Sequence, residues 1–339
     1  MKVVITGGCG FLGALLSREL LRQGALSLSG RGPQALHQIT LLDRVAPVAA
    51  IAADPRIHAD QGDLVDQLKA PQRAQALLRD VDLIVHLSAA VSAECEADFE
   101  LGLHSNLLAT QLVLEAARAE GLRRGQPPTV VFASSVAVFG KPLGEDFQAP
   151  PDDDTLPTPQ SSYGIQKFIG EQLMADYGRK GFIRARSVRL MTVSVRPGRP
   201  NGAASGFLSG MIREPLNGET AVVPVPPETR VALSSPQTTL EGLCLAAQAS
   251  DADWGPRTAM NLPACATTVG AMAQALAELA GPEVAARLQW VNDPAIARVV
   301  GSWPGVVRAS RAQALGLQPD PNAQAIVSQH MQALANGVS

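Results

Sequence analysis

A short apolar strand leads directly into a glycine-rich turn at the start of the chain. Glycines occupy positions 7, 10 and 13, after the apolar run Val3–Ile5 and up to the first turn of an amphipathic helical pattern over Phe11–Gln23. Glycine adopts positive φ at little cost and leaves backbone N–H groups open, so the turn can accept a pyrophosphate at the N-terminus of the helix. The spacing departs from Gly-x-Gly-x-x-Gly, and a turn that binds nothing is the alternative. The residues expected to contact a dinucleotide are Gly7, Gly10, Phe11, Leu12 and Gly13.

An acidic residue ends the next predicted strand, Gln38–Asp43. An aspartate there can accept hydrogen bonds from both ribose hydroxyls of a dinucleotide and repels a 2′-phosphate, so Asp43 favours NAD over NADP. The distance from Gly13 exceeds the usual spacing of about 20 residues, which we attribute to a loop insertion over Leu26–Leu36. Two alternatives stay open, because Arg44 could tolerate a phosphate and Asp43 could be a solvated strand end.

Strand-like and helix-like segments alternate over the first half of the chain. The strands are continuous apolar runs, which is typical of parallel strands covered on both faces, and the alternation predicts an α/β fold with a doubly wound parallel sheet of the Rossmann type. The predicted strands are Lys2–Thr6, Gln38–Asp43, Asp82–Ser88, Thr129–Ser134 and Arg184–Val195. The predicted helices are Phe11–Gln23, Asp66–Arg79, Phe99–Glu120 and Ser161–Arg179.

The regular alternation ends near Arg196. We interpret residues 1–195 as an NAD-binding Rossmann domain and residues 196–339 as a smaller substrate lobe, with segments around 229–262 returning to the main domain. The elements predicted after Arg196 are helices at Phe207–Arg213, Thr238–Ala249, Val269–Leu279 and Ala323–Ala335, and strands at Thr220–Val225 and Arg230–Ser234.

The overall composition excludes several classes of protein. A net charge of −3 and a pI near 6.0 give no basic surface for nucleic acid. No apolar run reaches 18 residues, so we expect no membrane span, and a strand at the very start leaves no room for a signal peptide. The four cysteines have neither metal-ligand spacing nor the density of a disulfide scaffold. These features predict a cytoplasmic protein without a metal site.

Tyr163 and Lys167 lie four residues apart in a helical pattern, so their side chains share one face. A free tyrosine titrates near pH 10, but a nearby ammonium favours its phenolate and makes it a usable base for an alcohol proton. Ser135 follows a predicted strand, where its hydroxyl can bond to the reacting oxygen. A Tyr-x-x-x-Lys pair alone could be a half-buried tyrosine and a surface lysine. After a glycine turn and a Ser-Ser strand end, it predicts hydride transfer with a nicotinamide cofactor.

These motifs together resemble the extended short-chain dehydrogenase/reductase superfamily of nucleotide-sugar epimerases and dehydratases. The matching residues, all within the first 200 or so, are Thr6–Gly13, Asp63-Leu64, His86–Ala90, Asn106, Ser134–Gly140 and Tyr163–Lys167. The family pattern has Tyr at Phe139 and Ala at Ser88, and neither change affects the expected chemistry. The resemblance implies cofactor contacts by Asp63 and Leu64 near the adenine and by Ala89 near the phosphates, and further contacts by Ser88, Ala90 and Asn106. The alternative for Asp63 is a helix N-cap.

The segment Arg189–Gly202 and its continuation through Phe207 are similar to the D-erythronate dehydrogenase branch of that superfamily. This similarity implies NAD-dependent oxidation of the 2-hydroxyl of a four-carbon sugar acid. Arginine suits a carboxylate, and we expect Arg196 or Arg230 to bind it; Arg230 is similar to the superfamily's substrate-binding arginine.

Two other functions remain open at this stage. One is a nucleotide-sugar epimerase or dehydratase with the same cofactor and base, in which Phe207 and Arg213 would serve the nucleotide. The other is a non-catalytic NAD-binding protein, which the presence of both Tyr163 and Lys167 disfavours. The superfamily resemblance also implies a homodimer formed through the helices Phe99–Glu120 and Ser161–Arg179.

Overall fold

Seven parallel strands form the central sheet of the molecule. They are β1 (Lys2–Thr6), β4 (Gln38–Asp43), β5 (Ile57–Gln61), β6 (Leu83–His86), β7 (Thr129–Ser135), β8 (Arg184–Leu190) and β12 (Ala259–Asn261). Their order is β12-β8-β7-β6-β1-β4-β5 and every neighbouring pair is parallel, which confirms the predicted doubly wound α/β fold. The structure is a computed structural model that describes residues 1–142, 145, 147–198, 203–255 and 259–336.

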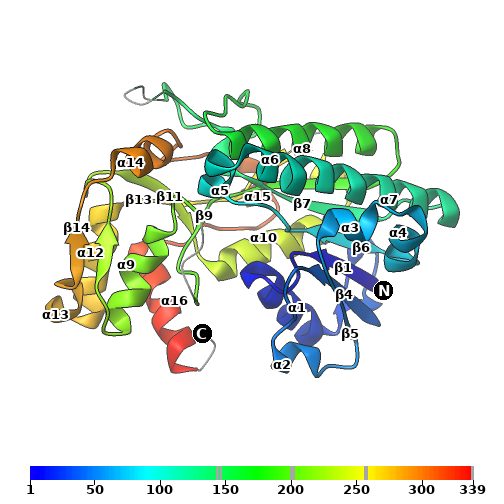
Figure 1. The fold of residues 1–339 in the computed structure, drawn as a ribbon, viewed down its shortest axis with the longest axis horizontal. Helices are drawn as coiled ribbons and strands as arrows, with labels where there is room; N and C mark the ends of the chain where they lie inside the picture. The colour runs from blue at the N-terminus through cyan, green and yellow to red at the C-terminus, as the bar shows by residue number, and fades with distance from the viewer. Residues whose placement is uncertain (143–144, 146, 199–202, 256–258, 337–339) are drawn as a thin grey trace.

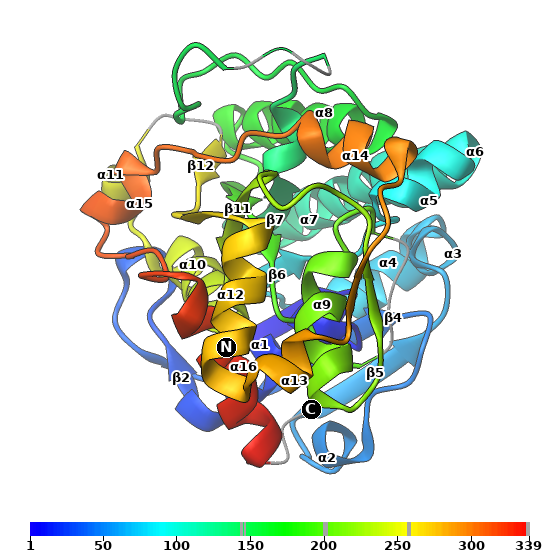
Figure 2. The same ribbon diagram turned by 90° about the vertical axis from the view of Figure 1, so that its left-hand side faces the viewer.

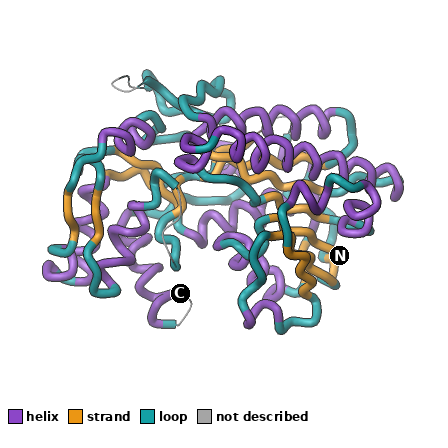
Figure 3. The backbone as a smooth tube through the Cα atoms, viewed as in Figure 1, coloured by secondary structure: helices purple, strands orange, loops and turns teal. Residues whose placement is uncertain are grey.

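Helices cover both faces of this sheet. Figure 3 shows the strands in orange between two layers of helices in purple. Val3 and Ile5 of β1 pack toward α1 (Phe11–Gln23) and α10 (Pro236–Gln248), whereas Val4 faces the opposite layer. The helices of that opposite layer are α3 (Leu64–Leu68), α4 (Pro71–Leu78), α7 (Ala109–Arg124) and α8 (Ser162–Arg179). Because side chains alternate along a strand, burial on both faces requires the continuous apolar runs seen in the sequence.

Two predicted helices are interrupted in the structure. The helix expected over Asp66–Arg79 is divided into α3 and α4, because Pro71 begins α4 and holds Ala70 before it in an extended conformation. The helix expected over Phe99–Glu120 is likewise divided. Its parts are α6 (Phe99–Gly102), a π-helical segment η2 (Leu103–Leu108) and α7, and a further helix, α5 (Ser92–Ala97), precedes them.

Both edge strands, β5 and β12, are absent from the sequence-based prediction. β5 carries exposed polar residues, and β12 has only three residues. The strand expected over Arg184–Val195 leaves the sheet at Leu190. Its continuation, β9 (Thr192–Val193), pairs with β11 (Arg230–Ser234) in a separate sheet that also includes β13 (Cys265–Thr268). The expected loop insertion Leu26–Leu36 contains part of a small antiparallel pair, β2 (Ala25–Leu26) and β3 (Gln34–Ala35).

A second apolar core lies beside the central sheet, at the left of Figure 1 and facing the viewer in Figure 2. Its main helices are α9 (Phe207–Leu216), α12 (Val269–Ala280) and α16 (Ala323–Ala335), which contribute Leu208, Met272 and Ile326 to the core. The remaining elements are α2 (Ala49–Ala52), α11 (Asp251–Trp254), α13 (Pro282–Ala285), α14 (Pro294–Gly301), α15 (Ser310–Ala314), β10 (Ala221–Val223), β14 (Leu288–Trp290), and the short turns η1 (Leu28–Gly30) and η3 (Val136–Val138). Within the described part of the chain, no helix combines the length and apolarity needed to cross a bilayer.

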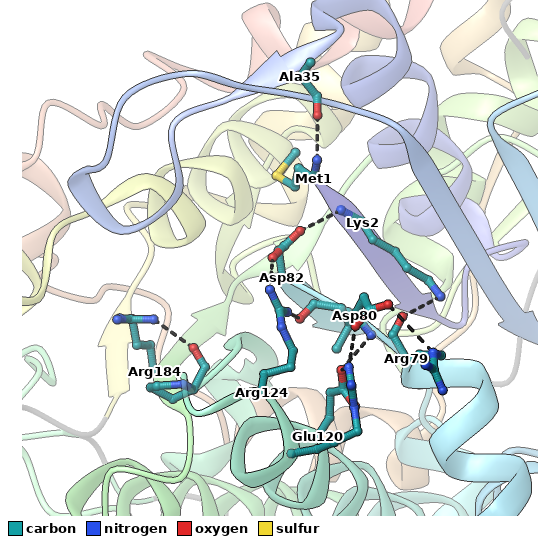
Figure 4. A network of polar contacts seen from close by, with 12 residues as sticks. Met1, Lys2, Ala35, Arg79, Asp80, Asp82, Glu120, Arg124 and Arg184 are labelled. Atoms are coloured by element: carbon teal, nitrogen blue, oxygen red, sulfur yellow. Dashed lines mark hydrogen bonds and ion pairs between the residues drawn. The ribbon is translucent and has the colours of Figure 1, made fainter.

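Polar contacts close the amino-terminal edge of the sheet (Figure 4). The Lys2 backbone N–H donates to Asp82 at 2.8 Å, and Arg124 pairs with the same carboxylate at 2.9 Å. Nearby, the Asp80 backbone N–H donates to Glu120 at 2.6 Å. Ion pairs and hydrogen bonds close this edge of the sheet. Doubly wound sheets bind their ligands at the opposite edge, where the strands end.

A buried ion pair joins the helix α8 to the sheet. Arg189 of β8 makes two parallel hydrogen bonds of 2.9 Å to Glu171, and Ser134 donates to the same carboxylate at 2.5 Å. Both charged side chains are almost completely buried, at 3% and 0% exposure. A charge in such a place is tolerated only with its partner, because desolvation of an isolated ion is costly.

We predict that Arg189→Met lowers the free energy of unfolding by about 3–5 kcal/mol, because it leaves the Glu171 carboxylate buried and unpaired. Urea denaturation measures this loss. Arg179→Met, which removes the exposed Arg179–Asp176 pair of the same helix, is the matched control and should cost less than about 1 kcal/mol. Adding Glu171→Leu to Arg189→Met should restore part of the loss; equal losses in the two single arginine variants would contradict the prediction.

Candidate active site

A cavity of about 480 Å³ opens where β1, β4, β6 and β7 end. This is the edge at which doubly wound sheets bind their ligands, near the point where the strand order reverses between β1 and β6. The residues singled out from the sequence that line it are Gly7, Gly10, Phe11, Leu12, Gly13, Asp43, Asp63, Leu64, Ser88, Ala89, Ala90, Ser135, Tyr163, Lys167 and Arg196. Asn106 and Arg230 do not line this cavity.

The three glycines of the first turn have three different roles. Gly7 adopts φ +66°, where a side chain would be strained. A Cβ on Gly13 would lie 2.3 Å from the Gly7 carbonyl oxygen, so this glycine lets α1 approach the turn. A Cβ on Gly10 would meet only that oxygen, at 3.3 Å, and Gly10 is the N-cap of α1. Gly10 therefore puts no side chain of its own between the helix N-terminus and the cavity, which favours the close approach of a pyrophosphate.

The Asp43 carboxylate lies against the glycine turn. It accepts backbone hydrogen bonds from Cys9 at 2.9 Å, Gly10 at 3.2 Å and Val45 at 3.3 Å. This arrangement fits a dinucleotide, since it places an acceptor for ribose hydroxyls next to N–H donors for phosphates. The excess chain between Gly13 and Asp43 leaves this contact intact.

Asp63 caps a helix and also lies in the cavity wall. It is the N-cap of α3, where it accepts from the Val65 backbone N–H at 2.9 Å, and it also lines the cavity. Arg44 and His104 bond to the same carboxylate at 2.6 Å and 3.0 Å. Burial alone would raise the pKa of Asp63, but these two partners outweigh it and lower the pKa to about 2.

Asn106 acts behind the cavity wall. Its carboxamide accepts from the Ala90 backbone N–H at 2.8 Å and donates to the Ala90 carbonyl at 3.1 Å. It also donates to Gln166 of α8 at 2.8 Å and to Cys95 at 3.2 Å. The polar atoms of Asn106 therefore connect Ala90 in the cavity wall to α8, and a direct contact of Asn106 with the cofactor stays a prediction.

Tyr163 of α8 and Ser135 at the end of β7 both line the cavity. Burial raises the pKa of the Tyr163 hydroxyl, whereas a hydrogen bond with Ser135 and the positive charge of Arg196 act in the opposite direction. The sequence assigned the activating charge to Lys167. The structure adds Arg196 as a cation that favours the phenolate, and it comes from the segment after β9 rather than from α8.

Lys167 is buried with one direct backbone partner. Its ammonium donates to the Ala133 carbonyl at 2.8 Å and lies 4.9 Å from the centre of the Phe132 ring and 5.7 Å from that of Tyr163. Burial lowers the pKa of Lys167 to about 8, while Cys95 and Glu171 partly oppose this shift. The charged ammonium is therefore held near Tyr163 at a cost in the free energy of folding.

The two candidate arginines have different positions. Arg196 lines the cavity, and among the described residues no carboxylate pairs with its guanidinium. Helix α9 holds its backbone at both ends, since Ser209 accepts from the Arg196 N–H at 3.0 Å and Arg213 donates to its carbonyl at 2.7 Å. Residues 199–202 of the motif that follows Arg196 lie outside the described residues.

Arg230 lies on the exposed end of β11, beside a much smaller cavity. That cavity shares Val136, Thr192 and Trp303 with the large one, so these residues form the wall between them. The segment after α14 packs closely here, and a Cβ on Gly305 would lie 2.4 Å from that of Arg230. The structure therefore places Arg230 outside the large cavity that Arg196 lines.

Several cavity residues carried no signal in the sequence. His104 stands in the π-helical segment, Ser205 follows the undescribed residues 199–202, and Trp303 follows α14. They meet the site only through tertiary packing. His104 could have been suspected from its proximity to Asn106 in the sequence, but Ser205 and Trp303 could not.

The geometry agrees with the comparison to known families. Residues 3–230 match the model of the NAD dependent epimerase/dehydratase family, and the chain belongs to that family. It is 44% identical to the D-erythronate dehydrogenase of Cupriavidus necator over 98% of both chains. It is 38% identical to the D-erythronate dehydrogenase of Haemophilus influenzae, over 98% of this chain and 99% of the relative.

One similar protein of known structure is described as an epimerase rather than a dehydrogenase. The crystal structure of the nucleoside-diphosphate-sugar epimerase from Agrobacterium tumefaciens superposes with a TM-score of 0.88 at 36% identity. The match covers 99% of this chain and 95% of the other. Proteins that are similar to this chain over nearly its whole length are therefore described both as dehydrogenases and as an epimerase.

We predict that Lys167→Met raises the free energy of unfolding at pH 7 by about 1–3 kcal/mol, because the buried ammonium is replaced by an apolar chain. The folded-state pKa is lowered from 10.5 to about 8, so the cost of the charge is full below pH 8 and shrinks as the pH rises toward 10.5. Urea denaturation at pH 7 and pH 9.5 tests this. The exposed Lys180 provides the control Lys180→Met; a gain for Lys167→Met that is equal at both pH values would contradict the prediction.

Proposed function

We propose that the protein catalyses the NAD-dependent oxidation of the 2-hydroxyl of a small sugar acid, with D-erythronate as the substrate and 2-dehydro-D-erythronate as the product. The observation that carries this proposal is the meeting of Ser135, Tyr163 and Arg196 in one cavity, where no carboxylate of the described residues pairs with the Arg196 guanidinium. A hydroxyl and a carboxylate of one small molecule would find their partners there. The two D-erythronate dehydrogenases at 44% and 38% identity support the same substrate.

Tyr163 serves as the general base in this proposal. Ser135 bonds to the substrate hydroxyl and orients it, and Tyr163 accepts the proton as the C–H bond at C2 breaks. Bound NAD supplies the hydride acceptor. The positive charge of Arg196 opposes the rise in the Tyr163 pKa that burial causes, and the Lys167 ammonium, 5.7 Å from the ring centre, would act in the same direction and enlarge the fraction of phenolate base.

Arg196 binds the carboxylate of the acid. Its planar guanidinium can make two charge-assisted hydrogen bonds to one carboxylate. With the hydroxyl held by Ser135 and the carboxylate by Arg196, the substrate is fixed at two points and its C2 position is defined. The clamp of Ser209 and Arg213 on the Arg196 backbone keeps this second point in place.

The cofactor of this proposal is NAD. Gly7, Gly10 and the N-terminus of α1 would hold the pyrophosphate, and Asp43 would accept hydrogen bonds from the adenosine ribose. The Asp43 carboxylate would repel the 2′-phosphate of NADP.

A nucleotide-sugar epimerase is the second candidate, because the Agrobacterium tumefaciens structure carries that description. The residues considered for the nucleotide do not favour it here. Arg213 is buried and bonded to Glu214 and to the Arg196 carbonyl, and neither Arg213 nor Phe207 lines the cavity.

A homodimer through α7 and α8 belongs to the same proposal. The two helices lie side by side along the upper part of Figure 1. Each exposes apolar side chains, Leu122 on α7 and Ile165 and Ile169 on α8, that a second copy of the chain would cover.

The proposed function is tested by screening four- to six-carbon sugar acids and UDP-sugars as substrates, with the formation of NADH as the measured signal. We expect NADH with D-erythronate and about 10²-fold slower turnover in Tyr163→Phe, the scale of a lost acid–base group. Interconversion of UDP-sugars without NADH would replace this proposal by the epimerase.

We predict that Arg196→Met raises KM for the sugar acid by about 10- to 100-fold, the effect of a lost charge-assisted hydrogen bond. The dissociation constant for NAD should stay within a factor of about 2, since NAD contacts other residues. Arg230→Met is the matched control, because Arg230 lies outside the large cavity, and its KM should remain close to that of the unmodified protein. Similar increases in both variants would remove Arg196 from the carboxylate site.

A further inference from the structure

Three side chains form a charged cluster at the Asp43 end of the cavity. Arg44 approaches one oxygen of Asp63 with two nitrogens, at 2.6 Å and 3.1 Å, and His104 bonds to the other oxygen at 3.0 Å. All three residues line the cavity. The cluster is partly buried, since the Asp63 side chain is 23% exposed and that of Arg44 is 58% exposed.

Arg44 directly follows Asp43, the residue that would meet the adenosine ribose. Its backbone is held in place, because Gln61 donates to the Arg44 carbonyl at 2.9 Å. Only its side chain is therefore free to change direction. An arginine at this position has the chemistry to bind a phosphate on the ribose, and Asp63 is the group that keeps its guanidinium occupied.

We propose that Asp63 is a specificity-determining residue, which excludes NADP by holding the Arg44 guanidinium away from a ribose 2′-phosphate. This inference rests on the proposed use of a nicotinamide dinucleotide. Two carboxylates then share the discrimination: Asp43 repels the extra phosphate, and Asp63 occupies Arg44, a neighbouring cation that could compensate for this repulsion. Without Asp63, the same chain would accept both dinucleotides more equally.

The decisive variant is Asp63→Asn. Asparagine is as good an N-cap as aspartate, so α3 should keep its first turn while the charge that holds Arg44 is lost. Isothermal titration of the protein with NAD and with NADP gives the two dissociation constants directly, without turnover. Any contact of residue 63 with the adenine is common to both dinucleotides and cancels in the ratio of the constants.

We predict that the ratio of the Kd for NADP to the Kd for NAD falls by about 10-fold in Asp63→Asn, the effect of one charge-assisted hydrogen bond gained by the phosphate. The double variant Asp63→Asn with Arg44→Met should return to the original ratio, because the released cation is then absent. Arg44→Met alone should leave the ratio within a factor of about 2, since Asp63 already occupies Arg44.

Asp66→Asn is the matched control. Asp66 lies on the same helix, loses the same charge, pairs with Lys69 and does not line the cavity. A similar change of the ratio in Asp66→Asn would overturn the inference, because overall charge would then explain it. So would an unchanged ratio in Asp63→Asn, or a change that persists in the double variant. NAD binding by the unmodified protein is read separately in the same titrations, and its absence would contradict the proposed function.

Discussion

All seven strands of the central sheet point in one direction, and this shared direction decides where the chemistry of the molecule can take place. The glycine turn follows β1, Asp43 ends β4, Ser88 follows β6 and Ser135 ends β7, so groups that are far apart in the chain meet at one edge. The same direction leaves the opposite edge with only strand beginnings, which are joined by ion pairs such as Arg124–Asp82. A sheet with mixed directions would have divided these groups between the two edges.

The protein buries charged side chains on α8 in two different ways. Glu171 and Arg189 satisfy one another and connect α8 to the sheet. Lys167, one helical turn away from Glu171, has a backbone carbonyl as its direct partner and a pKa lowered to about 8 by burial. The Glu171–Arg189 pair holds α8 against the sheet. The Lys167 ammonium donates to a carbonyl oxygen instead and lies 5.7 Å from the centre of the Tyr163 ring. Such a division between stable support and costly reactive groups is expected where function limits stability.

Local patterns in the sequence predicted much of this structure. The helices Phe11–Gln23 and Ala323–Ala335 and the strand Arg230–Ser234 occur with the expected bounds, because their periodicity and end signals are local. Long-range features could not be read in this way. The Asn106 carboxamide bonds to Ala90 and to Gln166, which is 60 residues away in the sequence, and nothing local to Asn106 indicates these partners. The position of Arg230 outside the large cavity likewise depends on the packing of Trp303 and Gly305, more than 70 residues later in the sequence, which the residues next to Arg230 do not reveal.

The late return of the chain to the sheet has a consequence for how the protein is made. β12 pairs with β8, residue Ala259 with Ser187, and its Asn261 approaches the buried Arg189 at 3.4 Å. The ribosome therefore releases β8 long before its neighbour exists, and the nascent chain exposes an open sheet edge while the intervening helices are still being synthesised. Unpaired edges of this kind favour association between incomplete chains. The last strand of the sheet thus couples completion of the central sheet to synthesis of residues 191–261, and residues 1–190 alone would leave β8 as an open edge.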